Sequence, residues 1–525
     1  MNVAYDRWIP VVTTSGDPIK ASLYAVLTEG DKFADLAVRP HERVSLMRLF
    51  LCVAHAALEG PKDYDEWCDV PKRLPDAAQT YLTHWKDSFE LFHDTKPWLQ
   101  VPGISKSING KASSTDIEDW TPVSKLNFSF ATGNNTTLFD HSGINENRSI
   151  PLVETVLSML TYQCFSPGGL ISQVFWEGVQ SGKSSKDGPC VPSSMIHAFL
   201  RGKDLPETIH LNIPTYEDIR FSYGERDFGK PIWEMMPTSL TDYVNVENAT
   251  ATYVGRLVPM TRLIRIHPTG VQMLLGDGLV YPPFTDGFPP EPTATVVIRP
   301  NGKKEERAIL SYRPAKAFWR ELAAVVVKRK AEGAGGPLSL RNIQDGENCD
   351  LIVVALARDK ATIVDTAESV FHIPSQLLSS VGTASYESEV KKAEFIASRL
   401  GWAVETYRYE VDHGWDGRLK SAGPSKGKLK AKLHSIATIH YWTTVENNLP
   451  LLSTHIEAIG TDKAIPSRDK WRKMLFASAC EAYRIACGQG TPRQMRAFAK
   501  GWQRLTGKKE ESESKTKESN KEVKV

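Results

Sequence analysis

The sequence predicts an α+β protein, in which a large mixed N-terminal domain of short strands and helices precedes a C-terminal antiparallel four-helix bundle. Two patterns support this division. Residues 205–300 mix short β-type runs with proline-rich turns, whereas the chain from Pro374 onward forms long amphipathic segments with short breaks, which is the pattern of a helix bundle. We therefore expect a mixed domain over 1–373, a basic bundle over 374–507 and a disordered Lys/Glu/Ser-rich tail over 508–525.

The mixed domain has its clearest helical signal between Arg43 and Leu58, where apolar residues recur at helical spacing. His55 lies within this apolar series, so we expect a satisfied core histidine rather than a metal ligand. Residues 103–126 are poorly periodic and are predicted to form a surface loop. The other predicted elements are three helices, Ala77–Leu91, Ile150–Phe165 and Ala315–Val327, and four strands, Thr252–Leu257, Leu263–Ile266, Thr295–Arg299 and Leu351–Ala357.

The C-terminal domain is expected to contain four helices joined by short connections. Ser467 and Thr491 are the predicted N-caps of the third and fourth helices, and Pro492 follows Thr491 at the first helical position, where its missing N–H costs nothing. The four predicted helices are Glu387–Glu410, Lys426–His455, Arg468–Cys487 and Pro492–Thr506.

The net charge of +2 hides an asymmetry along the chain. Residues 385–509 hold 22 Lys and Arg against 12 Asp and Glu, a net charge of +10, while residues 1–384 hold 38 against 45, a net charge of −7. A basic region of this kind is typical of a surface that faces a polyanion. A solvated basic face without a partner is the alternative interpretation.

Cysteine usage and hydropathy indicate a cytoplasmic protein with no membrane association. The seven cysteines are odd in number, scattered and never in a C-x-x-C pair, which fits reduced thiols and argues against a zinc ribbon or a disulfide scaffold. The first ten residues lack a basic-then-apolar signal pattern. No apolar run reaches the roughly 18 residues that a membrane helix needs.

The sequence also lacks the motifs that mark the common enzyme classes. It contains no H-E-x-x-H, no G-x-S-x-G and no dinucleotide fingerprint. Asp140-His141 has no third metal ligand nearby in sequence, and His434 and His440 are six residues apart, so on one helix they point to different sides. We therefore expect no metal, no cofactor and no catalytic residue.

Two loops rich in small residues are the strongest candidates for a binding surface. They cover Asn127–Gly143 and Cys164–Gly169, on either side of the helix predicted at Ile150–Phe165. Glycine and asparagine allow a main chain to approach a ligand closely. Neither loop holds a set of acid, base and nucleophile, so the composition favours recognition over reaction, with ordinary connectors as the alternative.

Several short motifs occur in an order that spans most of the chain, and together they resemble the CasA large subunit of type I-E Cascade, the CRISPR surveillance complex. The opening Asp6-Arg-Trp-Ile-Pro-Val11 matches that family's D-x-W-I-P-V. The motifs that follow it are Pro97-Trp-Leu-Gln100, Thr121-Pro122 with Lys125-Leu126, Pro167-Gly-Gly169, Phe199-Leu-Arg-Gly202, Gly278-Leu-Val-Tyr-Pro-Pro283 and Asp350-Leu-Ile352.

This resemblance implies a non-catalytic subunit of a crRNA-guided antiviral complex. Such a subunit recognises the protospacer-adjacent motif (PAM) in double-stranded DNA, promotes duplex opening and R-loop formation, and helps to recruit a separate helicase–nuclease. The implied partners are crRNA, target DNA, the helicase–nuclease, and the backbone, small and 5′-handle-binding subunits of Cascade. In RNA-guided recognition, base pairing to the guide recognises the target sequence, and protein contacts recognise the short duplex signal.

The resemblance also implies roles for particular residues. Its glycine-rich PAM loop aligns with Pro167, Gly168 and Gly169, and small residues suit the narrow minor groove. Its duplex wedge aligns with Asp359, Lys360 and Ala361, where some members carry glutamine in place of Lys360. The loop that contacts crRNA and neighbouring subunits aligns with Leu138, Phe139, Asp140 and His141.

Two further sets of site residues replace or add to the family pattern. The family's minor-groove lysine finger aligns near Val271-Gln272 rather than on a lysine, so Gln272 and Arg265 are the candidate donors here. A basic patch of Lys426, Lys428 and Lys430 is the candidate strand-guiding surface. Two other functions stay open from the sequence, namely a scaffolding RNA-binding subunit without DNA recognition and an unrecognised metal-dependent nuclease component.

Overall fold

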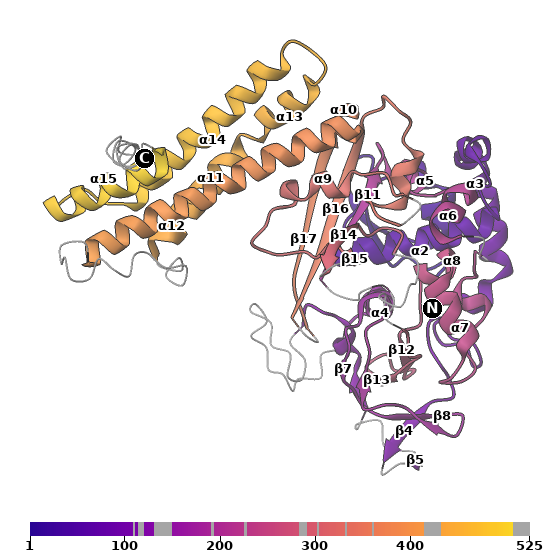
Figure 1. Cartoon of the computed structure of the whole chain (residues 1–525). Coiled ribbons are helices and arrows are strands. Elements are labelled where there is room, and N and C mark those ends of the chain that lie inside the picture. The colour runs from indigo at the N-terminus through magenta and orange to yellow at the C-terminus, as the bar shows by residue number, and fades with distance from the viewer. Residues whose placement is uncertain are drawn as a thin grey trace. The chain divides into compact units, whose positions relative to one another are not determined.

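The computed structural model describes residues 1–108, 111–113, 120–130, 150–188, 190, 194–224, 228–282, 291–301, 304–330, 333–359, 362–413 and 432–507. The chain divides into two compact units, Met1–Ile373 and Pro374–Val525 (Figure 1). The first unit mixes helices with strands, and the described part of the second contains helices. The predicted mixed α and β composition is therefore confirmed.

Short elements dominate the first unit. Its described helices are α1 (Leu23–Thr28), α2 (Pro40–Leu58), α3 (Tyr64–His84), α4 (Leu152–Phe165), α5 (Leu205–Leu211), α6 (Tyr216–Tyr223), α7 (Tyr243–Ala251), α8 (Tyr253–Leu257) and α9 (Leu322–Val325). Its described strands are β1 (Ile9–Thr13), β2 (Pro18–Ala21), β3 (Phe33–Leu36), β4 (Ser105–Ile108), β5 (Lys111–Ser113), β6 (Thr121–Pro122), β7 (Gly169–Leu170), β8 (Val174–Trp176), β9 (Val179–Gln180), β10 (Ser184–Ser185), β11 (Met195–Arg201), β12 (Arg262–Ile266), β13 (Gln272–Asp277), β14 (Val296–Asn301), β15 (Lys304–Ile309), β16 (Cys349–Asp359) and β17 (Thr362–Ile373).

Helix α2 is a central core element of the first unit, as its apolar periodicity predicts. It begins at Pro40, and the Glu42 carboxylate accepts the Arg39 backbone N–H at 2.9 Å, which satisfies a group that the helix itself leaves unpaired. Its side chains from Val44 to Ala54 are almost wholly buried. Full burial of a large apolar side chain stabilises a fold by roughly 1.5–3 kcal/mol relative to leaving it exposed. Helix α2 therefore accounts for much of the stabilisation by the core.

The longest strands of the first unit form a sheet in the order β11-β16-β17, with both pairs antiparallel. The predicted buried strand at Leu351–Ala357 is confirmed as the buried centre of β16. Arg43 of α2 joins this sheet to the core, since its Nε donates to Glu368 of β17 at 2.8 Å and its Nη1 lies 2.5 Å from Asp35 of β3. The middle of β17 is thus anchored to the main core.

His55 of α2 is the satisfied core histidine that the sequence predicts. Its Nε2 donates to the Pro214 carbonyl oxygen at 3.0 Å, and its ring packs against Tyr216 and Tyr253. Burial lowers the pKa of His55 to about 4, against the small opposing effect of the Pro214 hydrogen bond. The imidazole is therefore neutral in the folded protein at neutral pH.

This buried histidine predicts acid-sensitive stability. Because its folded pKa lies below the unfolded value near 6.5, its contribution is complete above about pH 6.5 and is lost as the pH falls toward 4, at a cost of about 3 kcal/mol. Urea unfolding at pH 7.5 and at pH 5 measures the loss. His55→Gln keeps an amide donor for Pro214 and removes the titration, so its stability is expected to depend less on pH. An unchanged pH dependence in this variant would contradict the assignment.

Several predicted elements of the first unit are wrong in type or extent. The helix predicted at Ala77–Leu91 is α3, which begins at Tyr64, contains Pro71 and Pro75, and ends at His84. The strand predicted at Thr252–Leu257 is helix α8, because the Thr252 hydroxyl accepts the Gly255 N–H at 3.2 Å and caps a helical turn.

Two other predictions for this unit hold only in part. The helix predicted at Ala315–Val327 is reduced to a 3₁₀ turn at Phe318–Arg320 and the short α9. The surface loop predicted over 103–126 includes strands β4, β5 and β6 among its described residues. The predicted strands at Leu263–Ile266 and Thr295–Arg299 are confirmed in β12 and β14, and the helix at Ile150–Phe165 is α4.

The second unit has the described helices α10 (Ser375–Leu378), α11 (Ser380–His413), α12 (Lys432–Asn447), α13 (Leu449–Glu457), α14 (Ala464–Ala486) and α15 (Pro492–Thr506). Helices α11, α12, α14 and α15 lie side by side (Figure 1). Tyr441 of α12 donates to the Ala393 carbonyl of α11 at 2.9 Å, and Arg472 of α14 pairs with the buried Glu389 of α11. Lys500 of α15 contacts Glu410 at 3.0 Å.

The helix boundaries in this unit correct two predictions. The helix predicted over Lys426–His455 breaks at Asn448, and α13 begins with Pro450 in its first turn, since a proline inside a continuous helix would remove a hydrogen bond and clash with the preceding turn. Ser467 lies inside α14, where its hydroxyl donates to the Lys463 carbonyl at 2.7 Å, so it is not an N-cap. Thr491 is confirmed as the N-cap of α15.

None of the helices in the described part of the chain has a stretch long and apolar enough to cross a membrane.

Candidate nucleic-acid interface

The predicted PAM loop follows directly from the C-terminal end of helix α4. The helix ends at Phe165, and Ser166 closes it by donating its N–H to the Tyr162 carbonyl. The Arg262 guanidinium, at the start of β12, then donates through Nη2 to the carbonyl oxygens of Pro167 at 3.0 Å and Lys186 at 2.8 Å. The buried Arg262 thus holds two segments of the loop region that are far apart in sequence.

Both glycines of the loop have their backbone groups paired. The Gly168 N–H donates to Asp187 Oδ1 at 2.7 Å, and the Gly169 N–H donates to Ser185 Oγ at 3.2 Å. Strand β7 pairs with β10 in the register Gly169 to Ser185 and Leu170 to Ser184. A Cβ at Gly168 would lie 2.8 Å from the Ser185 carbonyl oxygen, so close packing alone requires glycine at this position.

Asp187 links the PAM loop to the strand that leads to the predicted wedge. The same Oδ1 atom that accepts the Gly168 N–H lies 2.8 Å from Nη2 of Arg358, near the end of β16. The pairing of β16 with β17 runs to Asp359 opposite Thr362. Asp359 therefore lies one residue after Arg358, which contacts Asp187. Lys360 and Ala361 lie outside the described residues.

Arg262 and Asp277 form the buried electrostatic pair beneath the loop. Arg262 Nη1 lies 3.9 Å from Asp277 Oδ1, and the side chains are 1% and 9% exposed. Burial lowers the pKa of Arg262, against the attraction of Tyr162 and Asp277. Burial also raises the pKa of Asp277, against the attraction of Arg262 and the Gly278 N–H. Burial of both groups means that loss of either one leaves a costly unpaired charge.

Strands β12 and β13 place the two candidate minor-groove donors differently. Arg265 is exposed on β12, three residues beyond Arg262, and its Nη1 donates to the Ile104 carbonyl at 3.2 Å. This separation is roughly 10 Å along a strand. Gln272 is buried at the start of β13. Exposure therefore favours Arg265 as the side chain that can contact another molecule.

Sequence reasoning missed several residues that shape this surface. Arg262 and Asp187 hold the loop through the hydrogen bonds given above. Leu170, next to Gly169, is 90% exposed, and Lys183 and Lys186 are exposed on the segment paired with it. Lys183, Lys186 and Asp187 lie in the Lys/Ser/Asp-rich segment 181–189, which contributes strand β10.

The other predicted site residues lie outside the described residues. They are Leu138, Phe139, Asp140 and His141 of the crRNA-contact loop, and Lys426, Lys428 and Lys430 of the basic patch. Among the described residues, no group of three His, Cys, Asp or Glu side chains is arranged to hold a metal ion.

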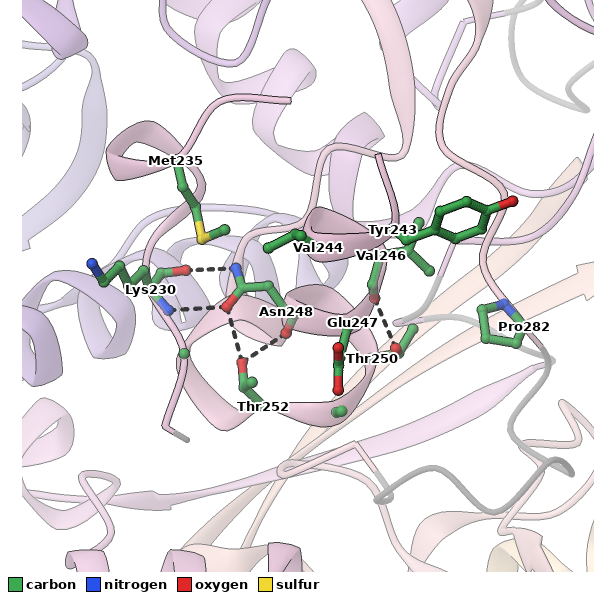
Figure 2. Close-up of a pocket in the computed structure, with 12 residues that line it drawn as sticks. Lys230, Met235, Tyr243, Val244, Val246, Glu247, Asn248, Thr250, Thr252 and Pro282 are labelled. Atoms are coloured by element: carbon green, nitrogen blue, oxygen red, sulfur yellow. Dashed lines mark hydrogen bonds between the residues drawn. The ribbon is translucent and has the colours of Figure 1, made fainter. Parts of the chain in front are cut away.

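A separate pocket of about 930 Å³ lies beside helix α7 (Figure 2). One wall is held by Asn248, which donates to the Lys230 carbonyl at 2.9 Å and accepts the Lys230 N–H at 3.0 Å (Figure 2). Tyr243 and Val244 at its rim are 78% and 66% exposed. None of the described site residues lines this pocket, so it is distinct from the PAM loop region.

Comparisons with known proteins agree along nearly the whole chain. The family model of CRISPR-associated protein Cse1 matches residues 2–482. The CRISPR-associated protein CasA/Cse1 of Thermus thermophilus is 29% identical over 526 residues, which cover 96% of each chain. The Cse1 structure of Thermobifida fusca aligns with a TM-score of 0.76 at 18% identity, over 96% of this chain and 98% of that one. A chain of a CRISPR RNA-guided surveillance complex aligns with a TM-score of 0.70 at 16% identity, over 96% and 99%.

The match to the family model identifies the chain as a CRISPR-associated protein. More particularly, the chain belongs to the CRISPR-associated protein Cse1 family, the CasA large subunit of Cascade, because the family model covers residues 2–482. The resemblance found from the ordered motifs is therefore confirmed.

Proposed function

We propose that this subunit is non-catalytic, recognises the PAM in double-stranded DNA, promotes duplex opening and R-loop formation, and helps to recruit a separate helicase–nuclease. The observation that carries the proposal is the convergence of three predicted segments. Arg262 of β12 holds the glycine loop, and Asp187 joins that loop to Arg358 near the end of β16. A recognition surface and an opening element need a connection of this kind. Groups that are loosely held must be ordered when DNA binds, and the entropy lost in ordering them lowers the affinity.

Each segment has a role in this proposal. Pro167, Gly168 and Gly169 face the minor groove, while Arg265 is the finger residue and Lys183 and Lys186 attract phosphates. The exposed Leu170 is suited to apolar contact in the groove, since minor-groove proteins often insert such side chains at base steps. The wedge comprises Asp359, Lys360 and Ala361.

The proposal extends to the partners and to the second unit. The loop Leu138–His141 contacts crRNA and the neighbouring Cascade subunits. Helices α11, α12, α14 and α15 form an antiparallel four-helix bundle, supported by contacts of Glu410 with Lys500 and of Arg399 with Arg504, which run in opposite directions along α11 and α15. Lys426, Lys428 and Lys430, in the segment of the sequence between α11 and α12, guide a DNA strand.

The test is binding of duplex DNA by the assembled complex. We expect the subunit to purify with a small RNA of uniform length, and the complex to bind a PAM-containing duplex more tightly than a PAM-less one, with an affinity that falls as salt rises. Equal affinity for the two duplexes would contradict PAM recognition. Loss of assembly on neutralising Lys426, Lys428 and Lys430 would support the scaffolding function instead.

Lys360→Ala tests the wedge. We expect initial PAM binding to persist and strand opening to slow, because the side chain acts at the first unpaired step rather than at the PAM. A fluorescent base analogue next to the PAM reports opening. Lys20→Ala, which removes an exposed lysine from β2, is the matched control and is expected to open DNA normally. Unchanged opening by Lys360→Ala removes the wedge role.

A further inference from the structure

We infer that Asp187 is a positioning residue that couples the glycine loop to the end of β16, so that DNA contact at the loop is transmitted to the duplex-opening hairpin. This inference rests on the proposed function above. The inference is supported by the position of one carboxylate oxygen. Asp187 Oδ1 lies 2.7 Å from the Gly168 N and 2.8 Å from Arg358 Nη2.

Two contacts hold the backbone that leads into Asp187. Its backbone neighbour Lys186 has its carbonyl oxygen bound by the buried Arg262, and Ser185, one residue earlier, pairs with Gly169 in the β7–β10 ribbon. Arg358 is only 13% exposed, and Asp187 is 33% exposed. Partial burial strengthens such a charged contact relative to an exposed ion pair. This contact therefore favours one placement of Arg358 relative to the loop.

Arg358 lies next to an irregularity in the β16–β17 ladder. The β16–β17 register shifts between Ala357 and Arg358, so Arg358 is the first residue beyond an irregularity in the ladder. The register skips Val364, so the extra residue is on β17, and a bulge bends the strand that carries it. The Arg358 N–H also donates to Ser194 Oγ at 2.9 Å. Asp187 thus contacts β16 beside this irregularity, one residue before Asp359.

The test separates the opening of DNA from the binding of its PAM. Asp187→Asn keeps an oxygen that can accept the Gly168 N–H but removes the charge that faces Arg358. We expect its opening rate, measured with a fluorescent base analogue in the assembled complex, to fall about tenfold more than its affinity for a short PAM duplex. A target carrying a preformed bubble next to the PAM is expected to restore near wild-type R-loop formation.

A second variant and a control keep the result specific. Arg358→Gln should reproduce the opening defect, and the double variant should open DNA no more slowly than the slower single variant, because both changes break one contact. Asp218→Asn is the matched control. It weakens a partly buried ion pair of the same unit, in which Asp218 Oδ1 lies 2.5 Å from Arg341 Nε, and is expected to leave the opening rate unchanged.

The outcomes are distinct. Equal losses of PAM affinity and opening rate, additive defects in the double variant, or a defect that the bubble does not relieve would each overturn the coupling role. A wild-type complex that does not distinguish PAM from PAM-less DNA would instead overturn the proposed function itself.

Discussion

Replacing Gly169 by aspartate is expected to weaken binding of the assembled complex to a PAM duplex about tenfold or more at low salt. The backbone at this position is held by Ser185, which accepts the Gly169 N–H and donates to its carbonyl oxygen at 3.1 Å. A carboxylate added to this backbone lies at the proposed groove contact, where it repels phosphates and takes up space in a groove only about 6 Å wide.

Gly169→Asn is the matched control, because it adds a side chain of the same size without the charge. The difference between the two variants should shrink as salt screens the charge, while the loss that they share should persist. Titration of a labelled duplex across the salt range measures both effects. If Gly169→Asp bound target DNA like the wild-type protein over that range, the groove contact of this loop would be wrong.

Replacing Arg262 by methionine is expected to produce the largest loss of stability, about 3 kcal/mol or more. The change removes the donor to the Pro167 and Lys186 carbonyls and leaves the buried Asp277 without its nearest cation. The loop would lose its support even if the rest of the first unit stayed folded. Urea denaturation gives the stability change, and limited proteolysis after Lys183 or Lys186 reports the state of the loop.

Two further variants make this prediction specific. Arg262→Lys keeps the charge but loses the planar fork that reaches two carbonyls, so an intermediate loss is expected. Arg265→Met alters an exposed arginine on the same strand, with a single described donation to Ile104, and should cost less than about 1 kcal/mol. A loss for Arg262→Met no larger than that for Arg265→Met would show that the buried arginine does not support the loop.

Local sequence patterns predicted the elements whose cause is local. The apolar periodicity of α2, the uninterrupted apolar run of β16 and the Thr491 cap of α15 all have their explanation within a few residues. Predictions from residue type alone were wrong at α3 and α8. Helix α3 continues through Pro71 and Pro75, and the β-branched start of α8 is helical because Thr252 caps it.

In the candidate site too, local motifs predicted some features and missed others. Ordered motifs located Pro167-Gly168-Gly169 and the strand before the wedge, but they did not reveal what joins them. Gly168 and Asp187 are 19 residues apart, and Asp187 and Arg358 are 171 apart, so only the folded chain brings the three together. The motifs also gave no reason for glycine at 168 beyond access to DNA, whereas the structure shows close packing against the Ser185 carbonyl.

The shared oxygen of Asp187 has a thermodynamic consequence that runs in both directions. If occupation of the loop favours one arrangement of the hairpin by a given factor, then engagement of the hairpin with separated strands must tighten the hold on the loop by the same factor. A target that has already been opened should therefore bind through its PAM more tightly than a closed one. The contact that helps to start opening would then also discourage release once opening has succeeded.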